Sequence, residues 1–181
     1  MADGLPESIA SLVSSVDTAP SFWQQGLLWS VLASSDQTGG AYSLMEQLMP
    51  AKVGAPPHLH ERSTELFYIL DGEMALQLGD QVITGHAGQL VRIPPGTLHG
   101  FAVLTETARV LNLYVPAALD LQVAMLSTPA TSPTLPPAGA QVPATAEQTN
   151  AFQARIRELT TQAWSTQPDL LGHLRGHSGP R

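Results

Sequence analysis

Cysteine is absent from this chain of 181 residues. Disulfides, thiolate metal ligands and cysteine nucleophiles are therefore excluded, and a metal can be held only by His, Asp or Glu. Positive charge is also scarce, with 8 Lys and Arg against 15 Asp and Glu, which gives a formal net charge of −7. Because binding to a phosphate backbone needs a basic face, nucleic acid is not expected as a partner.

Long apolar runs are missing as well. No stretch approaches the roughly 18 uninterrupted apolar residues of a membrane-spanning helix. The first residues, MADGLPES, lack the basic start and apolar core of a signal peptide. We therefore expect a cytoplasmic protein with no membrane partner. Its 43% hydrophobic and 13% charged residues are typical of a globular chain with a core.

Short apolar runs follow one another from residue 27 to residue 116. They are four to nine residues long and rich in Val, Leu, Ile, Phe and Tyr, with Gly, Pro, Asp or Asn between them. Such runs are typical of antiparallel strands and are too short for helices. Seven or eight strands in about ninety residues predict an all-β fold, either a closed barrel or a sandwich.

The flanking segments have a different character. A short helix is expected at 7–16 and a second one at 117–126. Residues 127–145 are rich in Pro, Ala, Ser and Thr, which predicts an extended loop. Phe152 and the apolar residues that follow it recur at spacings of four, three and four, which predicts an amphipathic helix over 146–164.

These patterns divide the chain into three parts. The expected division is an N-terminal segment, 1–27, a strand-rich domain, 28–116, and a C-terminal region, 117–181. The last part holds the helix, the Pro-rich loop, the amphipathic helix and a flexible tail.

Two histidines and a glutamate stand in the stretch GAPPHLHERSTELFYILDG, residues 54–72. Side chains alternate along a strand, so a strand here would turn His58 and His60 to the same side. Glu65 can then face the interior together with Phe67 and Ile69. A buried carboxylate needs a charged partner, hydrogen bonds or a metal.

A fourth candidate ligand is His99, three residues after a Pro95-Gly96 pair that suits the centre of a type II turn. It opens an apolar run, so its imidazole also needs a partner. Three imidazoles and one carboxylate that converge on an interior point suit a divalent transition metal. The donor types alone leave Fe, Mn, Co, Ni, Cu and Zn open.

Together these two segments resemble the paired signature motifs of the cupin superfamily. The first motif is matched at His58, His60, Glu65 and Gly72, with four and six residues in the last two intervals; Gly54 is nearer the first histidine than the family pattern has it. The second is matched at Gly88, Pro94, Gly96 and His99, with Val103 where the family has Asn. Residues 36–74 are similar to small single-domain members described as quercetin dioxygenase-like.

The resemblance implies a single antiparallel double-stranded β-helix, the cupin or jelly-roll barrel, over 28–116. A short N-terminal segment and C-terminal helices would flank it. It also implies one divalent metal per chain, held by His58, His60, Glu65 and His99. Cupins commonly pair, so a homodimer is expected. Taken alone, His-x-His is more often a pair of ordinary loop histidines; the full set of ligands at the family spacing favours a metal site.

The same alternation indicates the surroundings of the site. It puts Phe67, Ile69, Phe101 and Val103 on the face that carries the ligands, which predicts an apolar pocket for a small hydrophobic or aromatic substrate. Tyr42 is a further candidate for this pocket, although core packing is its more ordinary role.

Four protein ligands on a metal that takes five or six leave positions for water, dioxygen or substrate. The main hypothesis is a metal-dependent dioxygenase of enolic or aromatic, flavonol-like molecules. In it Glu65 leaves the metal and acts as the general base. One alternative is a redox-neutral isomerase, cyclase, decarboxylase or lyase, and another is a cupin that binds a small ligand without catalysis.

Overall fold

The computed structural model describes residues 12–155, which fall into two contact units, 1–144 and 145–181. The helix expected at 7–16 lies mostly outside the described residues. Within the first unit the described chain is almost entirely strand and turn, as the runs of apolar residues predicted. The α-helix among the described residues of this unit is α1, Leu119–Leu126, which lies inside the range 117–126 where a helix was expected.

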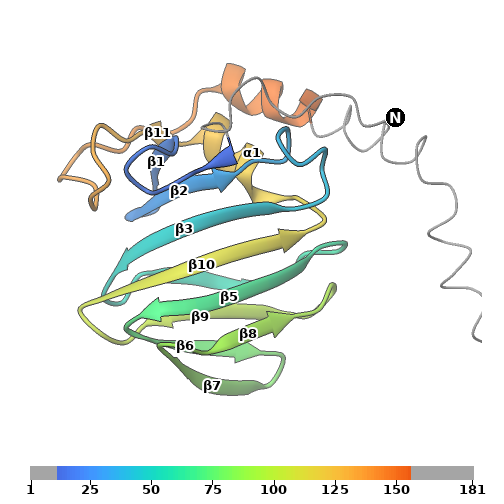
Figure 1. The fold of residues 1–181 in the computed structure, drawn as a ribbon, viewed down its shortest axis with the longest axis vertical. Coiled ribbons are helices and arrows are strands. Elements are labelled where there is room, and N and C mark those ends of the chain that lie inside the picture. Colours follow the sequence, from blue (N-terminus) through green and yellow to red (C-terminus); the bar gives the residue numbers. More distant parts are fainter. Residues whose placement is uncertain (1–11, 156–181) are drawn as a thin grey trace, which may run out of the picture. The chain divides into compact units, whose positions relative to one another are not determined.

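The strands form two antiparallel sheets (Figure 1). The large sheet has the order β11-β1-β2-β3-β10-β5-β8 and the small sheet the order β4-β9-β6-β7. The strand bounds are β1 Ser21–Gln24, β2 Leu27–Ala33, β3 Ser43–Pro50, β4 Gly54–His58, β5 Thr64–Asp71, β6 Glu73–Leu78, β7 Gln81–His86, β8 Leu90–Ile93, β9 His99–Val103, β10 Thr107–Val115 and β11 Thr128–Pro129.

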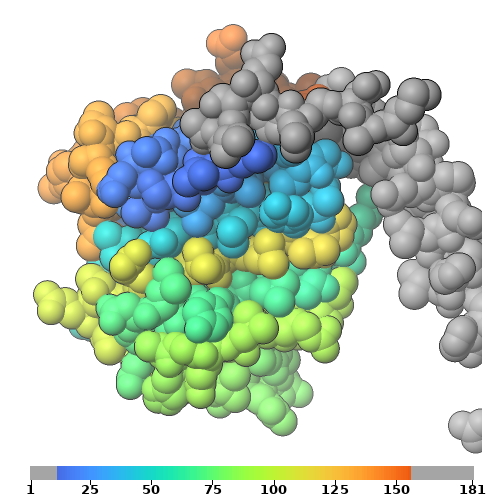
Figure 2. Space-filling view, in the orientation of Figure 1, coloured from blue at the N-terminus to red at the C-terminus, as the bar shows by residue number. Residues whose placement is uncertain are grey.

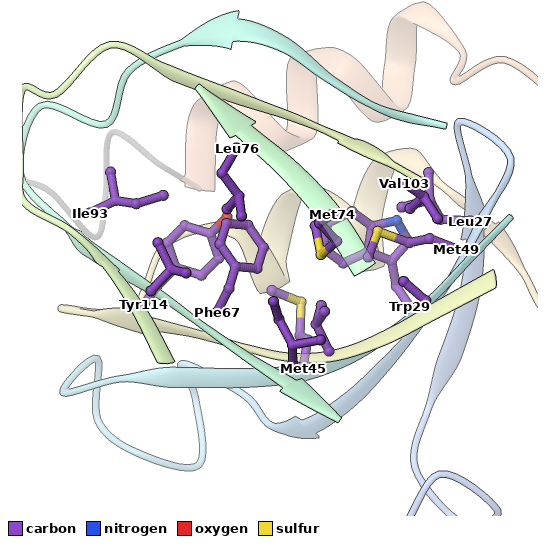
Figure 3. Close-up of a cluster of buried hydrophobic side chains, with 14 of the residues drawn as sticks. Leu27, Trp29, Met45, Met49, Phe67, Met74, Leu76, Ile93, Val103 and Tyr114 are labelled. Atoms are coloured by element: carbon purple, nitrogen blue, oxygen red, sulfur yellow. The ribbon is translucent and has the colours of Figure 1, made fainter. Parts of the chain in front are cut away.

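Period-two alternation gives the large sheet a buried and an outer face. Along β3 every second residue, starting at Ser43, is buried, and β10 and β5 repeat the pattern from Ala108 and Glu65. These inner faces meet side chains of the small sheet in one hydrophobic cluster that holds Met45, Phe67, Met74, Leu76 and Val103 among others (Figure 3). The flexible methionines fill the irregular space between the sheets.

The two sheets are not joined edge to edge by any strand pairing among residues 12–155. Of the two architectures that the sequence left open, the described chain is therefore an open two-sheet sandwich with jelly-roll character. The all-β antiparallel fold itself is confirmed.

Strand β4 lies at an edge of the small sheet, where prolines are tolerated because one side of the strand needs no ladder hydrogen bonds. Pro56 and Pro57 occupy this edge. Gly54 approaches the neighbouring strand so closely that a Cβ there would lie 1.8 Å from the carbonyl oxygen of Phe101. This close contact holds β4 against β9. Strand β4 ends at His58, the first candidate ligand.

Strands β6 and β7 form a hairpin with its turn at Gly79 and Asp80. Two details differ from the sequence-based expectations. Strand β1 lies within the segment 1–27, where no strand was expected. The Pro-rich segment is mostly loop, but Thr128 and Pro129 pair with Trp23 and Phe22 as β11. The indole of Trp23 also donates a hydrogen bond to the carbonyl of Thr134, at 2.8 Å.

The second unit begins a helix where the amphipathic pattern predicted one, at residue 146. The Thr145 hydroxyl accepts a hydrogen bond from the Gln148 backbone N–H at 3.2 Å, and the Gln148 side chain accepts one from the Thr145 N–H at 2.9 Å. This is a capping box, which satisfies two amides at the helix start. The helix is described to residue 155, and its predicted remainder lies outside the described residues. No helix in the described chain is both long and apolar enough to cross a membrane.

Candidate metal centre

The structure brings together the four side chains that the sequence singled out. One potential ligand atom from each of His58, His60, Glu65 and His99 lies within 4.8 Å of the others. The set draws on both sheets: β4 and β9 of the small sheet supply His58 and His99, and β5 of the large sheet supplies Glu65. His60 comes from the connection between β4 and β5.

His58 and His99 are directly opposite each other across the β4–β9 pair, and their ring centroids are 4.3 Å apart. Each Nδ1 faces a backbone carbonyl, that of Pro56 at 2.9 Å and that of Thr97 at 2.8 Å. A carbonyl only accepts hydrogen bonds, so each Nδ1 carries the hydrogen. That tautomer directs Nε2 toward the centre of the group as the ligand atom.

His60 is positioned by a turn rather than by a strand. The sequence favoured a strand through both histidines, but β4 ends at His58. The carbonyl of His60 accepts a hydrogen bond from the N–H of Gly96 at 2.8 Å, in the turn where Gly96 has φ +73°. The two sequence motifs are thus joined through their backbones. The ring of His60 also meets the ring of Tyr114 edge-on, with centroids 5.2 Å apart.

Glu65, the one carboxylate among the four candidate ligands, is almost completely buried, with 2% of its surface exposed. Its Oε2 lies 2.8 Å from Nε2 of His99 and 3.2 Å from Nε2 of His60. Its Oε1 accepts hydrogen bonds from the hydroxyl of Tyr114 at 2.5 Å and from the amide of Asn112 at 2.9 Å. The two carboxylate oxygens therefore have different surroundings.

These contacts set the proton affinities at the site. Burial alone would raise the pKa of Glu65, but the neighbouring imidazoles and the donors Tyr114 and Asn112 outweigh it and hold that pKa well below its usual range. Burial likewise works against a charged His99, yet the hydrogen bond to Glu65 raises the His99 pKa. Burial lowers the pKa of His58, and burial together with the charge of Glu65 raises that of Tyr114.

Sequence reasoning missed the groups that support Glu65. Asn112 and Tyr114 lie on the inner face of β10, where Tyr114 is opposite Glu65 in the strand register. Gln47 on β3 is buried as well and donates to the carbonyl oxygen of Asn112 at 3.1 Å. The available signal was the alternation in TARVLNLYV, which puts Asn112 in phase with Val110 on the buried face.

The expected pocket residues lie at different depths. Phe67, Ile69 and Val103 belong to the packed core, and Phe101 meets Phe67 edge-on with ring centroids 5.3 Å apart. Tyr42 is at the surface with 42% of its area exposed. Their role in binding a substrate stays a prediction.

Two exposed leucines, which the sequence reading did not single out, flank the ligands. Leu59 stands between His58 and His60, and Leu98 immediately precedes His99. They are 49% and 45% exposed. Because His58 pairs with His99 in an antiparallel register, these are the next positions along the same pair of chains. Because side chains alternate along paired strands, we expect both leucines to turn away from the face that carries His58 and His99.

The donor set fits a divalent transition metal. Nε2 of His60 is buried and has no hydrogen-bond partner among the described residues, although it is 3.2 Å from Glu65. Buried polar atoms without partners are rare, and an imidazole nitrogen in that position is suited to metal ligation. By contrast, His86 is exposed, and its Nδ1 lies 3.2 Å from Oε1 of Glu73.

Comparison with known proteins places these residues in context. Residues 44–114 match the family model described as Cupin domain. The quercetin 2,3-dioxygenase of Bacillus subtilis is 25% identical over 93 residues, which is 51% of this chain and 28% of that protein. The chain thus spans little more than a quarter of the curated relative that it matches.

Two solved structures share the fold. A predicted oxalate decarboxylase of Thermotoga maritima aligns with a TM-score of 0.53 at 17% identity, over 57% of this chain and 98% of that one. An RmlC-like cupin from Shewanella frigidimarina aligns with a TM-score of 0.51 at 18% identity, over 57% and 88%. At these identities the likeness concerns the fold.

The pairing of Glu65 with His99 predicts a pH window for the stability of the metal-free protein. The lowered pKa of Glu65 means that its ionised form stabilises the fold above its ordinary pKa of 4.5, and that this contribution is lost as the pH falls. The raised pKa of His99 means that its contribution is complete below its ordinary pKa of 6.5 and is lost as the pH rises through the raised value. Both contributions are present together between these two pH values.

We therefore expect the free energy of unfolding of the wild type to exceed that of Glu65→Gln most between pH 4.5 and 6.5. Urea unfolding in the presence of a chelator, from pH 3.5 to pH 9, measures this difference. Glu73→Gln, which breaks the exposed pair with His86, is the matched control and should give a small difference. A Glu65→Gln difference that does not vary with pH would contradict the prediction.

Proposed function

We propose, from the premise that this chain belongs to the cupin superfamily, that it is a metal-dependent enzyme acting on a small molecule at His58, His60, Glu65 and His99. The most favoured reaction is a dioxygenation of an enolic or aromatic, flavonol-like substrate. The observation that carries the proposal is the convergence of three imidazoles and one carboxylate within 4.8 Å of one another, with a buried and unpartnered nitrogen on His60.

Such a site would hold one divalent transition metal, from the group Fe, Mn, Ni, Co, Cu and Zn. The bound metal would supply a Lewis acid that binds an acidic oxygen of the substrate and lowers its pKa. The protein would supply three Nε2 atoms and Oε2 of Glu65. The carbonyls of Pro56 and Thr97 fix the tautomers of His58 and His99 through their Nδ1 atoms.

Glu65 is the group that would accept the proton of the substrate hydroxyl. Its Oε2 faces the histidines, whereas Oε1 is already engaged by Tyr114 and Asn112. The apolar residues expected around the ligands, Phe67, Ile69, Phe101 and Val103, support an apolar substrate that directs one acidic oxygen inward. The similarity to a quercetin dioxygenase agrees with this class of substrate.

The first prediction concerns the metal. Purified wild-type protein is expected to carry about one transition-metal ion per chain, and His58→Ala should lose most of it because a quarter of the ligand set is removed. Plasma mass spectrometry of protein dialysed against metal-free buffer measures the ratio. His86→Ala removes an imidazole outside the cluster and should keep the wild-type amount. If His58→Ala kept the full amount of metal, His58 would not be a ligand and the proposed metal site would be wrong.

The second prediction concerns dioxygen. Metal-loaded protein is expected to consume oxygen in an electrode when flavonols or related enolic aromatics are added, and Glu65→Gln should lower the rate about 100-fold or more, because general bases contribute 10²–10⁴-fold. The same mixtures are then followed under argon. Turnover without oxygen would replace the dioxygenase with a redox-neutral isomerase, cyclase, decarboxylase or lyase. Tight binding without turnover in either gas would favour a ligand-binding cupin.

The outer face of the large sheet supports the expected homodimer. Antiparallel sheets usually turn polar side chains to solvent. Here the outward positions of β3, β10, β5 and β8 are mostly apolar. The apolar ones are Leu44, Leu48, Leu66, Tyr68, Leu70, Leu90, Leu111, Leu113 and Val115, and the polar ones include Glu46, Arg92 and Arg109. Figure 2 shows these strands as neighbouring cyan, yellow and green bands on one side of the molecule.

The size of this face suits a second copy of the chain. Three strands about 27 Å long and the four-residue β8, spaced about 4.8 Å apart, cover roughly 450 Å² in projection, before the shape of the side chains is counted. A standard interface buries about 800 Å² per partner. The ion pair between Arg109 and Glu46 lies within this face and is satisfied internally at 2.6 Å, and Arg92 on β8 adds a positive charge opposite Leu66.

We expect the wild type to be a dimer by light scattering after gel filtration, and Leu90→Glu to shift it toward monomer. Leu90 is 58% exposed and opposite Tyr68, so the substitution should leave the subunit folded. Val82→Glu is the control, since Val82 is 70% exposed on β7 of the other sheet. A monomeric wild type, or equal dissociation by both variants, would refute this interface.

A further inference from the structure

The two oxygens of Glu65 are engaged by different parts of the protein. Oε2 faces the imidazoles of His99 and His60, at 2.8 and 3.2 Å. Oε1 is turned into the large sheet and accepts from Tyr114 at 2.5 Å and from Asn112 at 2.9 Å. Both donors are completely buried side chains of β10. Neither belongs to the motifs that identify the candidate ligands.

A third residue fixes the orientation of the Asn112 amide. Gln47 on β3 donates to Oδ1 of Asn112 at 3.1 Å, so the nitrogen of Asn112 must point to Glu65. The hydrogen bonds thus run from β3 through β10 to β5, three neighbouring strands of the large sheet. Rotation of the carboxylate would break two hydrogen bonds and leave two buried donors unsatisfied, which is unfavourable.

We propose that Tyr114 and Asn112 are positioning residues that clamp Oε1 of Glu65, so that Glu65 presents Oε2 alone to the metal and stays bound through it. This inference rests on the proposed metal site and deepens it. A carboxylate held in this way is a one-oxygen ligand. A proton that Glu65 accepts goes to Oε2, and the carboxylate stays in the site while it does so. The clamp therefore replaces the mobile base of the sequence-based hypothesis, in which Glu65 leaves the metal, with a fixed Glu65.

Tyr114 contributes more than its hydroxyl. Its ring lies edge-on to His60, with centroids 5.2 Å apart, while the hydroxyl reaches Glu65. One side chain therefore contacts two of the four ligands. Tyr114→Phe keeps the ring and removes only the hydroxyl, so it isolates the contact with Oε1.

The test is cobalt binding, which reports both the affinity and the number of ligand atoms. Metal-free protein is titrated with Co²⁺ against a competing chromophoric chelator, and the visible absorption of bound Co²⁺ is recorded. Because outer hydrogen-bond partners of metal ligands typically change affinity 10–100-fold, Tyr114→Phe is expected to weaken Co²⁺ binding at least about tenfold. Release of Oε1 should also let the carboxylate bind through two oxygens, which raises the coordination number and weakens the visible bands.

Two further variants complete the experiment. Tyr68→Phe removes the hydroxyl of a tyrosine on the outer face of β5 and should match the wild type in affinity and spectrum. Asn112→Ser removes the second donor and should change the spectrum in the same direction as Tyr114→Phe. It also carries the test if circular dichroism shows that Tyr114→Phe does not fold.

The outcomes separate the clamp from the site itself. A wild type that binds no Co²⁺ overturns the metal site and the clamp with it. A wild type that binds Co²⁺ while Tyr114→Phe and Asn112→Ser keep its affinity and spectrum overturns the clamp alone. Weaker binding with an unchanged spectrum also contradicts the clamp, because a general loss of packing would produce it.

Discussion

The position of one carboxylate constrains most of this structure. Glu65 is placed on the inner face of a strand whose next inward residues are Phe67 and Ile69, and an isolated charge there would be costly. Four neighbouring groups offset that cost: two imidazoles from the small sheet and its connection, and two donors from β10. The register of β10 with β5, which puts Tyr114 opposite Glu65, and the pairing of His58 with His99 must both be correct for this to happen. The buried charge therefore favours one arrangement of the two sheets over others in which it would be left without partners.

The same polar interior explains an unusual distribution of side chains over the large sheet. Inner positions are given to Glu65, Asn112 and Gln47, while outer positions on the same strands carry Leu66, Leu111 and Leu113. If stability alone decided the sequence, apolar residues would be expected at the inner positions and polar residues at the outer ones. Positions where a sequence departs from this pattern are often functional. Here the polar residues gather at the candidate ligands, and the apolar residues gather on a face large enough to meet another subunit.

Much of this arrangement could be predicted from the sequence, because side chains along a strand alternate between the two faces of the sheet. The strands follow the apolar runs of residues 27–116, since turn residues mark the ends of these runs. The four candidate ligands were predicted because their residue types and spacings are both specific. Strand β1 was not, because it is only four residues long, and β11 was not, because its two residues gain their hydrogen bonds from β1, more than a hundred residues away. Tyr114 and Asn112 were missed for a related reason: their function depends on which strand lies beside β5, and that is a property of the topology.

The charges at the site constrain the substrate more tightly than they constrain the reaction. Three imidazoles that bind through Nε2 are neutral, so Glu65 supplies the only negative charge among the proposed ligands. A divalent metal in such a set retains one positive charge, which an anionic oxygen of the substrate can neutralise. The acidic surface of the chain would repel an anion at long range, but that field is screened over about 8 Å in physiological salt. Close to the histidines, the apolar cluster that holds Phe67 and Phe101 favours an apolar body instead. An aromatic enol satisfies both demands, and so does a hydrophobic carboxylic acid. Dioxygenation and a redox-neutral step can thus share one binding mode, and they differ only in whether oxygen completes the reaction.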